Sequence, residues 1–344
     1  MKGPQGFAYP VTPQADEGAN WNPSVPLRFR IVTWNMGDSK YTQDQWKNDL
    51  LGSWDFINRQ DYDVLALCLQ EDSRGKYGHL ADAVGSLLQS TFTMVSNSVE
   101  GPPEVSGQHF SVRAYLFLRK SIFVNMTTRK NDVCLKRAVF CLKGTAGVAV
   151  IVFLGQSVFQ ILLMSSHLPV STSTEDLGYE ERIQAVKKSM ETVYDQLVDT
   201  TIQKRIAFWA GDLNFREGTP THPGGKPLDQ LKQARSTRKA GFWRDFEEPE
   251  VEFPPTCKMA SCKDDQCPIC RKDSGKNFTP SCYIQETTKS RGKVTERVPS
   301  HCDRIHYRID GVTAEYSEYR SWGDSQLLQH SDHNLVLSSF FVYL

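Results

Sequence analysis

The sequence has no excess of charge of either sign, since its 344 residues include 40 Lys and Arg against 40 Asp and Glu. Such a balance gives no global argument for binding nucleic acid or for a polybasic membrane anchor. Residues 1–20 contain no apolar stretch typical of a secretory signal, and residues 340–344 carry no lipidation or retention motif. We therefore expect a cytoplasmic protein whose nine cysteines are reduced.

One segment lacks charge over a length that could cross a bilayer, because residues 144–167 contain no Lys, Arg, Asp or Glu. However, Gly155, Gln156 and Ser157 interrupt it, and the flanking residues are largely β-branched and aromatic. This pattern favours two buried strands joined by a tight turn over a membrane span.

Short apolar runs alternate with polar segments from residue 27 onward, without an internal repeat. The predicted strands are residues 28–34, 64–69, 113–118, 148–154, 158–164, 205–209 and 335–343. The predicted amphipathic helices are residues 45–58, 80–88 and 180–197. Residues 1–25 are expected to form a flexible tail, and residues 26–344 a single domain. Residues 257–297 lack periodicity and are expected to form a long, Cys-rich insertion.

Polar residues stand just past the ends of several predicted strands. These residues are Asn35, Glu71, His167, Asp212 and Asn214. Each one alone would usually be a turn former. Together with Asp303 and residues 331–333, they indicate a site mounted on rigid strand ends.

The residue types fit phosphoryl transfer. Glu71 and Asn35 offer hard oxygen ligands of the kind that Mg²⁺ prefers. Asp212 could orient or deprotonate a water, while Asn214 and His167 could donate hydrogen bonds to a phosphoryl oxygen. Positioning and charge stabilisation of this kind supply most of the catalysis in that chemistry. The sequence contains neither a P-loop nor a G-x-S-x-G motif.

Two segments resemble the signatures of the inositol polyphosphate 5-phosphatases. They are residues 208–216, FWAGDLNFR, and residues 299–305, PSHCDRI. Supporting matches follow in the family's order at residues 33–35, 69–71, 143–144, 166–168, 229–231, 253–256 and 331–333. The resemblance covers residues 29–341, nearly the whole chain.

The resemblance implies an α+β fold of the deoxyribonuclease-I-like endonuclease/exonuclease/phosphatase superfamily. This fold is a four-layer α/β/β/α sandwich of two mostly antiparallel sheets. The implied activity is Mg²⁺-dependent removal of the 5-phosphate from phosphoinositides or soluble inositol polyphosphates by an activated water. The implied catalytic residues are His167, Asp212, Asn214, Asp303 and His333. The implied metal-site residues are Asn35, Glu71 and Asp332.

The resemblance assigns the contacts with the neighbouring ring phosphate to Lys258, Arg297 and Arg304. Three departures from the family pattern fall in the same region. Cys257, Thr295 and His301 stand where the family usually has Tyr, Lys and an aromatic residue. They concern substrate recognition rather than the hydrolytic centre.

The insertion also contains a cysteine pattern that could hold a structural Zn²⁺. Cys262, Cys267, Cys270 and Cys282 could close a tetrahedral thiolate site, and one C-x2-C is present. An iron–sulfur cluster and an insertion with free thiols are the alternatives.

Two other functions compete with the phosphatase hypothesis. A nuclease of the same superfamily would need a basic groove, which the balanced charge does not favour. A catalytically inactive binding module would not need the complete set of polar residues at the strand ends. We expect a monomer that binds an inositol phosphate headgroup, with peripheral membrane contact, no transmembrane span and no nucleic-acid partner.

Overall fold

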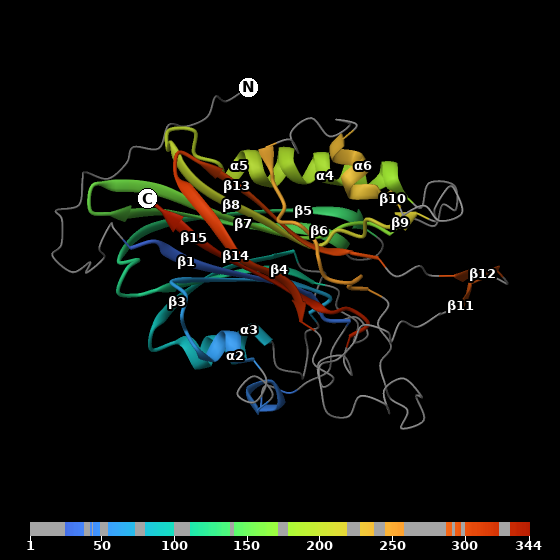
Figure 1. The fold of residues 1–344 in the computed structure, drawn as a ribbon, viewed down its shortest axis with the longest axis horizontal. Coiled ribbons are helices and arrows are strands. Elements are labelled where there is room, and N and C mark those ends of the chain that lie inside the picture. The colour runs from blue at the N-terminus through green and yellow to red at the C-terminus, as the bar shows by residue number, and fades with distance from the viewer. Residues whose placement is uncertain are drawn as a thin grey trace.

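Two β-sheets pack face to face in the computed structural model (Figure 1). The structure describes residues 25–37, 42, 44–48, 54–72, 80–99, 111–137, 141–170, 178–218, 228–236, 245–257, 287–290, 293–296, 300–322 and 331–344. Most of the predicted tail, Lys258, Arg297 and the four cysteines of the predicted zinc site lie outside these residues.

The first sheet has six strands in the order β14-β15-β1-β2-β4-β3. These strands are β1 (Leu27–Asn35), β2 (Val64–Gln70), β3 (Phe92–Val99), β4 (Val112–Arg119), β14 (Thr313–Trp322) and β15 (Leu335–Tyr343). The second sheet has the order β13-β8-β7-β6-β5. Its strands are β5 (Asn125–Arg137), β6 (Cys141–Leu154), β7 (Ser157–His167), β8 (Lys204–Asp212) and β13 (Asp303–Asp310).

Helices cover the outer face of each sheet (Figure 1). Helices α2 (Asp55–Asn58) and α3 (Leu80–Leu88) lie on the first sheet, and α4 (Tyr179–Ser189), η1 (Met190–Tyr194), α5 (Asp195–Leu197) and α6 (Gln230–Ser236) on the second. Two small ribbons, β9 (Glu217–Gly218) with β10 (Leu228–Asp229) and β11 (Thr287–Ser290) with β12 (Lys293–Glu296), complete the described elements. The predicted four-layer sandwich is confirmed.

The core between the sheets is built from the inward side of alternating strand residues. Phe208 of β8 lies between Phe29 of β1 and Phe340 of β15, with ring centroids 5.7 and 5.1 Å away. One further apolar cluster lies between each sheet and its own helices, which makes two such clusters in the described residues. Because both faces of the central strands are buried, these strands read as continuous apolar runs, which is why the sequence revealed them.

The predicted strands are confirmed, including the pair β6 and β7, which turn at Gly155 with φ +58°. Among the described residues, no helix has the length and apolarity needed to cross a bilayer. The predicted helix 45–58 is wrong as one continuous helix, because Trp54 has φ −99° and ψ 62°. Strand β14 was missed because most of its side chains are exposed or half-buried and give no apolar run.

The strand register brings the predicted site residues to one edge of the two sheets. Neighbouring strands in each sheet are antiparallel except β1–β2 and β7–β8, which are parallel. Asn35 at the end of β1 lies beside Gln70 at the end of β2. His167 and Asp212 likewise end β7 and β8 side by side, and Asp303 begins β13 opposite Asp212. Parallel strands end at the same edge, so the topology itself gathers these residues.

Arg304 on β13 is directed into the protein rather than toward a substrate. Its side chain is 1% exposed, and its guanidinium donates to Glu248 Oε2 at 2.6 Å and to Asp229 Oδ2 at 3.1 Å. Both carboxylates already neutralise its charge. This geometry argues against the predicted contact between Arg304 and a ring phosphate, and it assigns Arg304 to the buried framework.

His306 and Glu248 form a buried cluster with Arg304. Burial raises the pKa of Glu248, but the Arg304 and His306 charges outweigh it and lower the pKa to about 2. Burial lowers the pKa of His306 to about 4, although Glu248 acts in the opposite direction. His306 is thus neutral in the folded protein at pH 7.

We predict that stability falls as the pH drops from 6.5 toward 4. The unfolded chain then binds a proton at His306 that the folded protein, with its pKa of about 4, does not bind. Each pKa unit by which His306 differs between the folded and the unfolded chain changes the free energy of unfolding by about 1.4 kcal/mol. Urea unfolding at pH 7.5 and 5.5 should therefore show a smaller loss of stability in His306→Asn than in the wild type. An identical loss in both proteins would contradict the assignment.

Gly211 allows β7 and β8 to approach closely at the site. Its φ is +151°, and a Cβ atom there would lie 1.9 Å from the Ser166 carbonyl oxygen. We expect Gly211→Ala to lower the free energy of unfolding by several kcal/mol, since backbone must shift. Gly85→Ala in α3 is the matched control, because its nearest neighbours are 3.9 Å away. It should be neutral or stabilising by up to about 1 kcal/mol in thermal unfolding.

Candidate active site

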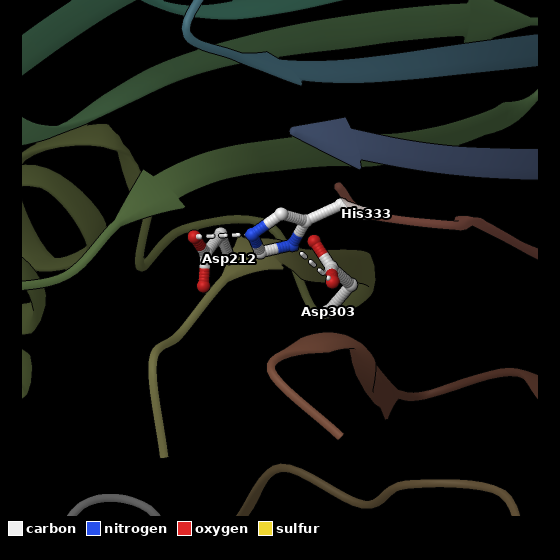
Figure 2. Close-up of side chains that lie close together, drawn as sticks. All are labelled: Asp212, Asp303 and His333. Carbon is white, nitrogen blue, oxygen red and sulfur yellow. Dashed lines mark hydrogen bonds and ion pairs between the residues drawn. The ribbon is translucent and has the colours of Figure 1, made fainter. Parts of the chain in front are cut away.

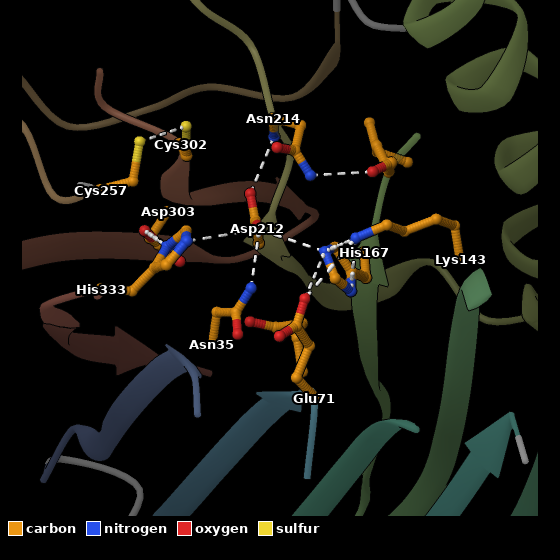
Figure 3. Close-up of polar contacts among 12 residues, drawn as sticks. Asn35, Glu71, Lys143, His167, Asp212, Asn214, Cys257, Cys302, Asp303 and His333 are labelled. Atoms are coloured by element: carbon orange, nitrogen blue, oxygen red, sulfur yellow. Dashed lines mark hydrogen bonds and ion pairs between the residues drawn. The ribbon is translucent and has the colours of Figure 1, made fainter. Parts of the chain in front are cut away.

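The Asp212 carboxylate lies at the centre of the gathered strand ends (Figure 3). Its Oδ2 accepts a hydrogen bond from Asn35 Nδ2 at 2.9 Å and lies 3.2 Å from His167 Nε2. Its Oδ1 accepts the backbone N–H of Asn214 at 3.0 Å. The His333 Nε2 atom lies 4.0 Å from Oδ2 on a further side. Groups from both sheets therefore converge on one carboxylate, which is 2% exposed.

A second carboxylate holds His333 in place (Figure 2). Asp303 Oδ2 lies 2.8 Å from His333 Nδ1 and accepts a hydrogen bond from Thr256 Oγ1, also at 2.8 Å. The backbone N–H of His333 donates to Ser331 Oγ, and Ser331 Oγ donates to the carbonyl of Asn35. Asp303 thus fixes the imidazole with its Nε2 atom directed toward Asp212.

The two carboxylates set the charge of His333. Burial lowers the pKa of this imidazole, but the charges of Asp303 and Asp212 outweigh burial and raise the pKa to about 10. Burial raises the pKa of Asp212, whereas His333 and His167 together hold it well below its usual range. At neutral pH the site therefore contains an ionised Asp212 beside an imidazolium.

His167 differs from His333 in its electrostatic surroundings. It is 1% exposed, and its ring contacts the Lys143 ammonium, with Nδ1 3.3 Å from Nζ. Burial and the Lys143 charge together lower the pKa of His167. Glu71 Oε1 lies 3.7 Å from His167 Nε2 and 3.8 Å from Lys143 Nζ. His167 is therefore a neutral hydrogen-bonding group at pH 7.

Two site residues have a backbone conformation that side chains rarely adopt. Glu71 and Asn214 each have φ +53°, although neither is glycine. Such strain costs of order 1–3 kcal/mol and persists where the surroundings impose it, which is common at functional sites. For Asn214, the side chain donates to the Leu168 carbonyl at 2.9 Å and accepts from Arg216 at 2.9 Å. These contacts fix the turn after β8.

Three residues of the site were not assigned a role from the sequence. The Lys143-Gly144 motif was visible in the sequence, but the contact of Lys143 with His167 was not. That contact arises because Gly144 lies opposite His167 in the strand register. Thr256 and Arg216 were part of matched motifs, yet nothing in their spacing showed that they hold Asp303 and Asn214.

The expected metal residues offer a donor set that suits Mg²⁺. Figure 3 shows the Asn35 and Glu71 side chains next to each other beneath Asp212. Glu71 provides a half-buried carboxylate and Asn35 an amide oxygen, which here accepts from Gly37 N–H at 3.0 Å. The Asp332 carboxylate lies 3.8 Å from His333 Nε2 and is 38% exposed. Oxygen donors of this kind fit a hard cation that retains several waters.

Among the described residues, Asp212, Asp303 and His333 also have potential ligand atoms within 4.8 Å of one another. The His333 Nδ1 atom is already engaged by Asp303, and the cluster is fully buried. We therefore interpret this trio as an imidazolium held between two carboxylates rather than as the metal centre.

The expectation of reduced thiols holds for only part of the described chain. Cys68, Cys257 and Cys302 are free, whereas Cys134 on β5 is disulfide-bonded. No spacing pattern in the sequence pointed to this bond, and the expectation for Cys134 is corrected.

Comparisons with known proteins show the family to which the chain belongs. The family model described as endonuclease/exonuclease/phosphatase family 2 matches residues 32–339. Phosphatidylinositol 3,4,5-trisphosphate 5-phosphatase 2B of Danio rerio is 23% identical over 344 residues, covering 91% of this chain and 24% of that protein. The chain spans only 16–28% of the length of the first three curated relatives.

Solved structures share the fold. The inositol polyphosphate 5-phosphatase domain of SPsynaptojanin, in complex with inositol (1,4)-bisphosphate and a calcium ion, has a TM-score of 0.55 at 17% identity, covering 92% of this chain and 84% of that one. Cimex nitrophorin, solved as a ferrous NO complex, has a TM-score of 0.50 at 19% identity, covering 93% and 99%. The fold alone therefore does not decide the function. The family match spans most of the sequence, and the chain belongs to endonuclease/exonuclease/phosphatase family 2.

Proposed function

We propose that this protein is a Mg²⁺-dependent phosphatase that removes the 5-phosphate from inositol phosphate headgroups. The observation that carries the proposal is the buried Asp212 carboxylate, flanked by Asn35, His167 and a His333 that Asp303 holds. The names of the relatives, which are inositol phosphate 5-phosphatases, support this substrate class.

The ionised Asp212 is suited to orient a water and accept its proton. Its two oxygens are held by Asn35 and by the Asn214 backbone, so the carboxylate is fixed before substrate arrives. Fixing the nucleophile in line with the phosphorus removes much of the entropic barrier to attack. The low pKa of Asp212 keeps it unprotonated across the physiological range.

The cationic groups are suited to the charge that develops on the phosphoryl oxygens. The His333 imidazolium and the Lys143 ammonium lie on different sides of Asp212, and neutral His167 can donate a further hydrogen bond. Preorganised donors of this type stabilise the transition state more than the ground state. A Mg²⁺ ion held by Glu71 and Asn35, with Asp332 nearby, would neutralise charge on the transferred group.

The remaining expectations stand as proposals. Lys258 and Arg297 are proposed to contact the neighbouring ring phosphate, and the four cysteines of the insertion to hold a Zn²⁺. We also propose a cytoplasmic monomer with peripheral membrane contact and no nucleic-acid partner. The alternative, a nuclease of the same superfamily, would act on phosphodiesters.

We predict that Asp212→Asn and His333→Ala each lower kcat by about 10²-fold or more, the usual cost of removing one stabilising group. Phosphate release would be measured from inositol lipids, soluble inositol phosphates and nicked DNA, with Mg²⁺ and with a chelator. Asp55→Asn is the matched control, since its side chain is 65% exposed on α2 and the charge change is the same. It should behave like the wild type.

Thermal unfolding would show whether the variants remain folded. Wild-type turnover in either site variant would contradict the assignment of that residue. Cleavage of DNA without phosphate release from any inositol substrate would favour the nuclease. Undiminished phosphate release with the chelator would contradict the metal requirement.

A further inference from the structure

Two buried thiols lie side by side next to the His333–Asp303 pair, above it in the view of Figure 3. The Sγ atoms of Cys257 and Cys302 are 2.9 Å apart, and neither side chain is exposed. Both cysteines are free. A disulfide bond is about 2.05 Å long, so the two sulfur atoms need to approach by roughly 0.9 Å to form one. Neither thiol takes part in the proposed hydrolysis.

The two thiols are on the segments that hold the catalytic pair. Thr256, next to Cys257, donates to Asp303, which follows Cys302. The backbone of Cys257 donates to the Ser300 carbonyl at 3.1 Å, and Cys257 forms isolated bridges with both Ser300 and His333. The two thiols are thus on the residues adjacent to the Thr256–Asp303 hydrogen bond. A shift in the distance between the two sulfur atoms will therefore change the geometry of that hydrogen bond.

Arg216 contacts one of the two thiols. Its Nη1 donates to Cys257 Sγ at 3.3 Å, and its Nη2 donates to Asn214 Oδ1 at 2.9 Å. Burial raises the pKa of the Cys257 thiol, but the hydrogen bond from Cys302 and the Arg216 charge outweigh it and lower the pKa to about 7. The thiolate is the form that reacts with peroxides and disulfides.

We propose that Cys257 and Cys302 form an oxidation site, at which a peroxide produces a reversible disulfide that lowers the activity of the enzyme. The Cys257 thiolate attacks one peroxide oxygen, and the O–O bond breaks to release hydroxide and leave a sulfenic acid. The Cys302 thiol gives its proton to the hydroxyl of the sulfenic acid as its sulfur attacks the Cys257 sulfur, so the S–S bond forms, the S–O bond breaks and water leaves. Two thiols are oxidised by two electrons, and hydrogen peroxide is reduced to water.

The disulfide would affect the site by two routes. A disulfide sulfur carries no charge, so Arg216 loses an anionic partner while it still binds Asn214, which in turn orients Asp212. The approach of the two sulfurs also draws the Thr256 and Asp303 segments together. Small displacements at a positioned catalytic group cause large losses in rate.

The test uses this chain, reduced and then titrated with hydrogen peroxide. Mass spectrometry of the unreduced digest measures the peptide that links Cys257 to Cys302, and phosphate release from an inositol 4,5-bisphosphate measures activity. We expect kcat to fall by about tenfold or more as the linked peptide accumulates, because the catalytic pair is displaced. Dithiothreitol should reverse both changes.

Two variants control for other oxidation. Cys257→Ser keeps an acceptor for Arg216 but removes the disulfide, so its activity should resist peroxide. Cys68→Ser alters another buried free thiol, on β2, whose Sγ lies 3.8 Å from the Met164 carbonyl. This variant should respond to peroxide as the wild type does.

Three results would overturn the proposal: no linked peptide when activity is lost, full linkage without loss of activity, or equal peroxide sensitivity in a folded Cys257→Ser. The first two need only the wild type, so they decide the matter if the variant does not fold. The effect on activity rests on the proposed function, whereas the linked peptide does not. A linked peptide in a protein that cleaves no inositol phosphate would therefore reject the function and keep the disulfide.

Discussion

The site depends on a single costly arrangement, the burial of the ionised Asp212 carboxylate where the two sheets meet. An isolated charge in a protein interior is strongly unfavourable unless hydrogen bonds and opposite charges surround it. Here the compensation comes from Asn35 of the first sheet, from His167 and Asn214 of the second, and from His333 on the segment that enters β15. The carboxylate therefore links the packing of the two sheets to the assembly of the site.

The arrangement of parallel strands explains why this carboxylate can be reached from both sheets. Each sheet contains one parallel pair, β1–β2 and β7–β8, in otherwise antiparallel surroundings. In each pair, two strands end at the same edge of their sheet. The packing of Phe29 against Phe208 in the core brings the two sheets, and with them these two edges, together. At Gly211, the absence of a side chain lets the backbone of β8 lie close to the backbone of Ser166 on β7. The site geometry is thus a consequence of the core.

The central strands and the polar residues at their ends could be predicted from the sequence, because full burial makes these strands apolar on both faces. Apolar periodicity could not predict the role of a residue when that role comes from a contact with a residue distant in the sequence. Arg304 illustrates the limit, since only the structure shows that Glu248, 56 residues away, already occupies its guanidinium. Strand β14 and the interrupted helix at Trp54 were missed because exposed strands and local backbone breaks leave little trace in apolar periodicity.

The structure explains one departure from the family pattern, His301, by the contacts of its ring. His301 stands where the family usually has an aromatic residue, and its ring still packs against Phe253, with centroids 5.8 Å apart. In addition, its Nδ1 contacts the Glu217 carboxylate and its Nε2 lies 2.7 Å from the Phe253 carbonyl. The two ring nitrogens thus each face an oxygen acceptor, one from a side chain and one from the backbone. The substitution retains the ring contact and adds two polar ties between the segments around residues 217 and 253, which secures the loop that carries Thr256 to Asp303.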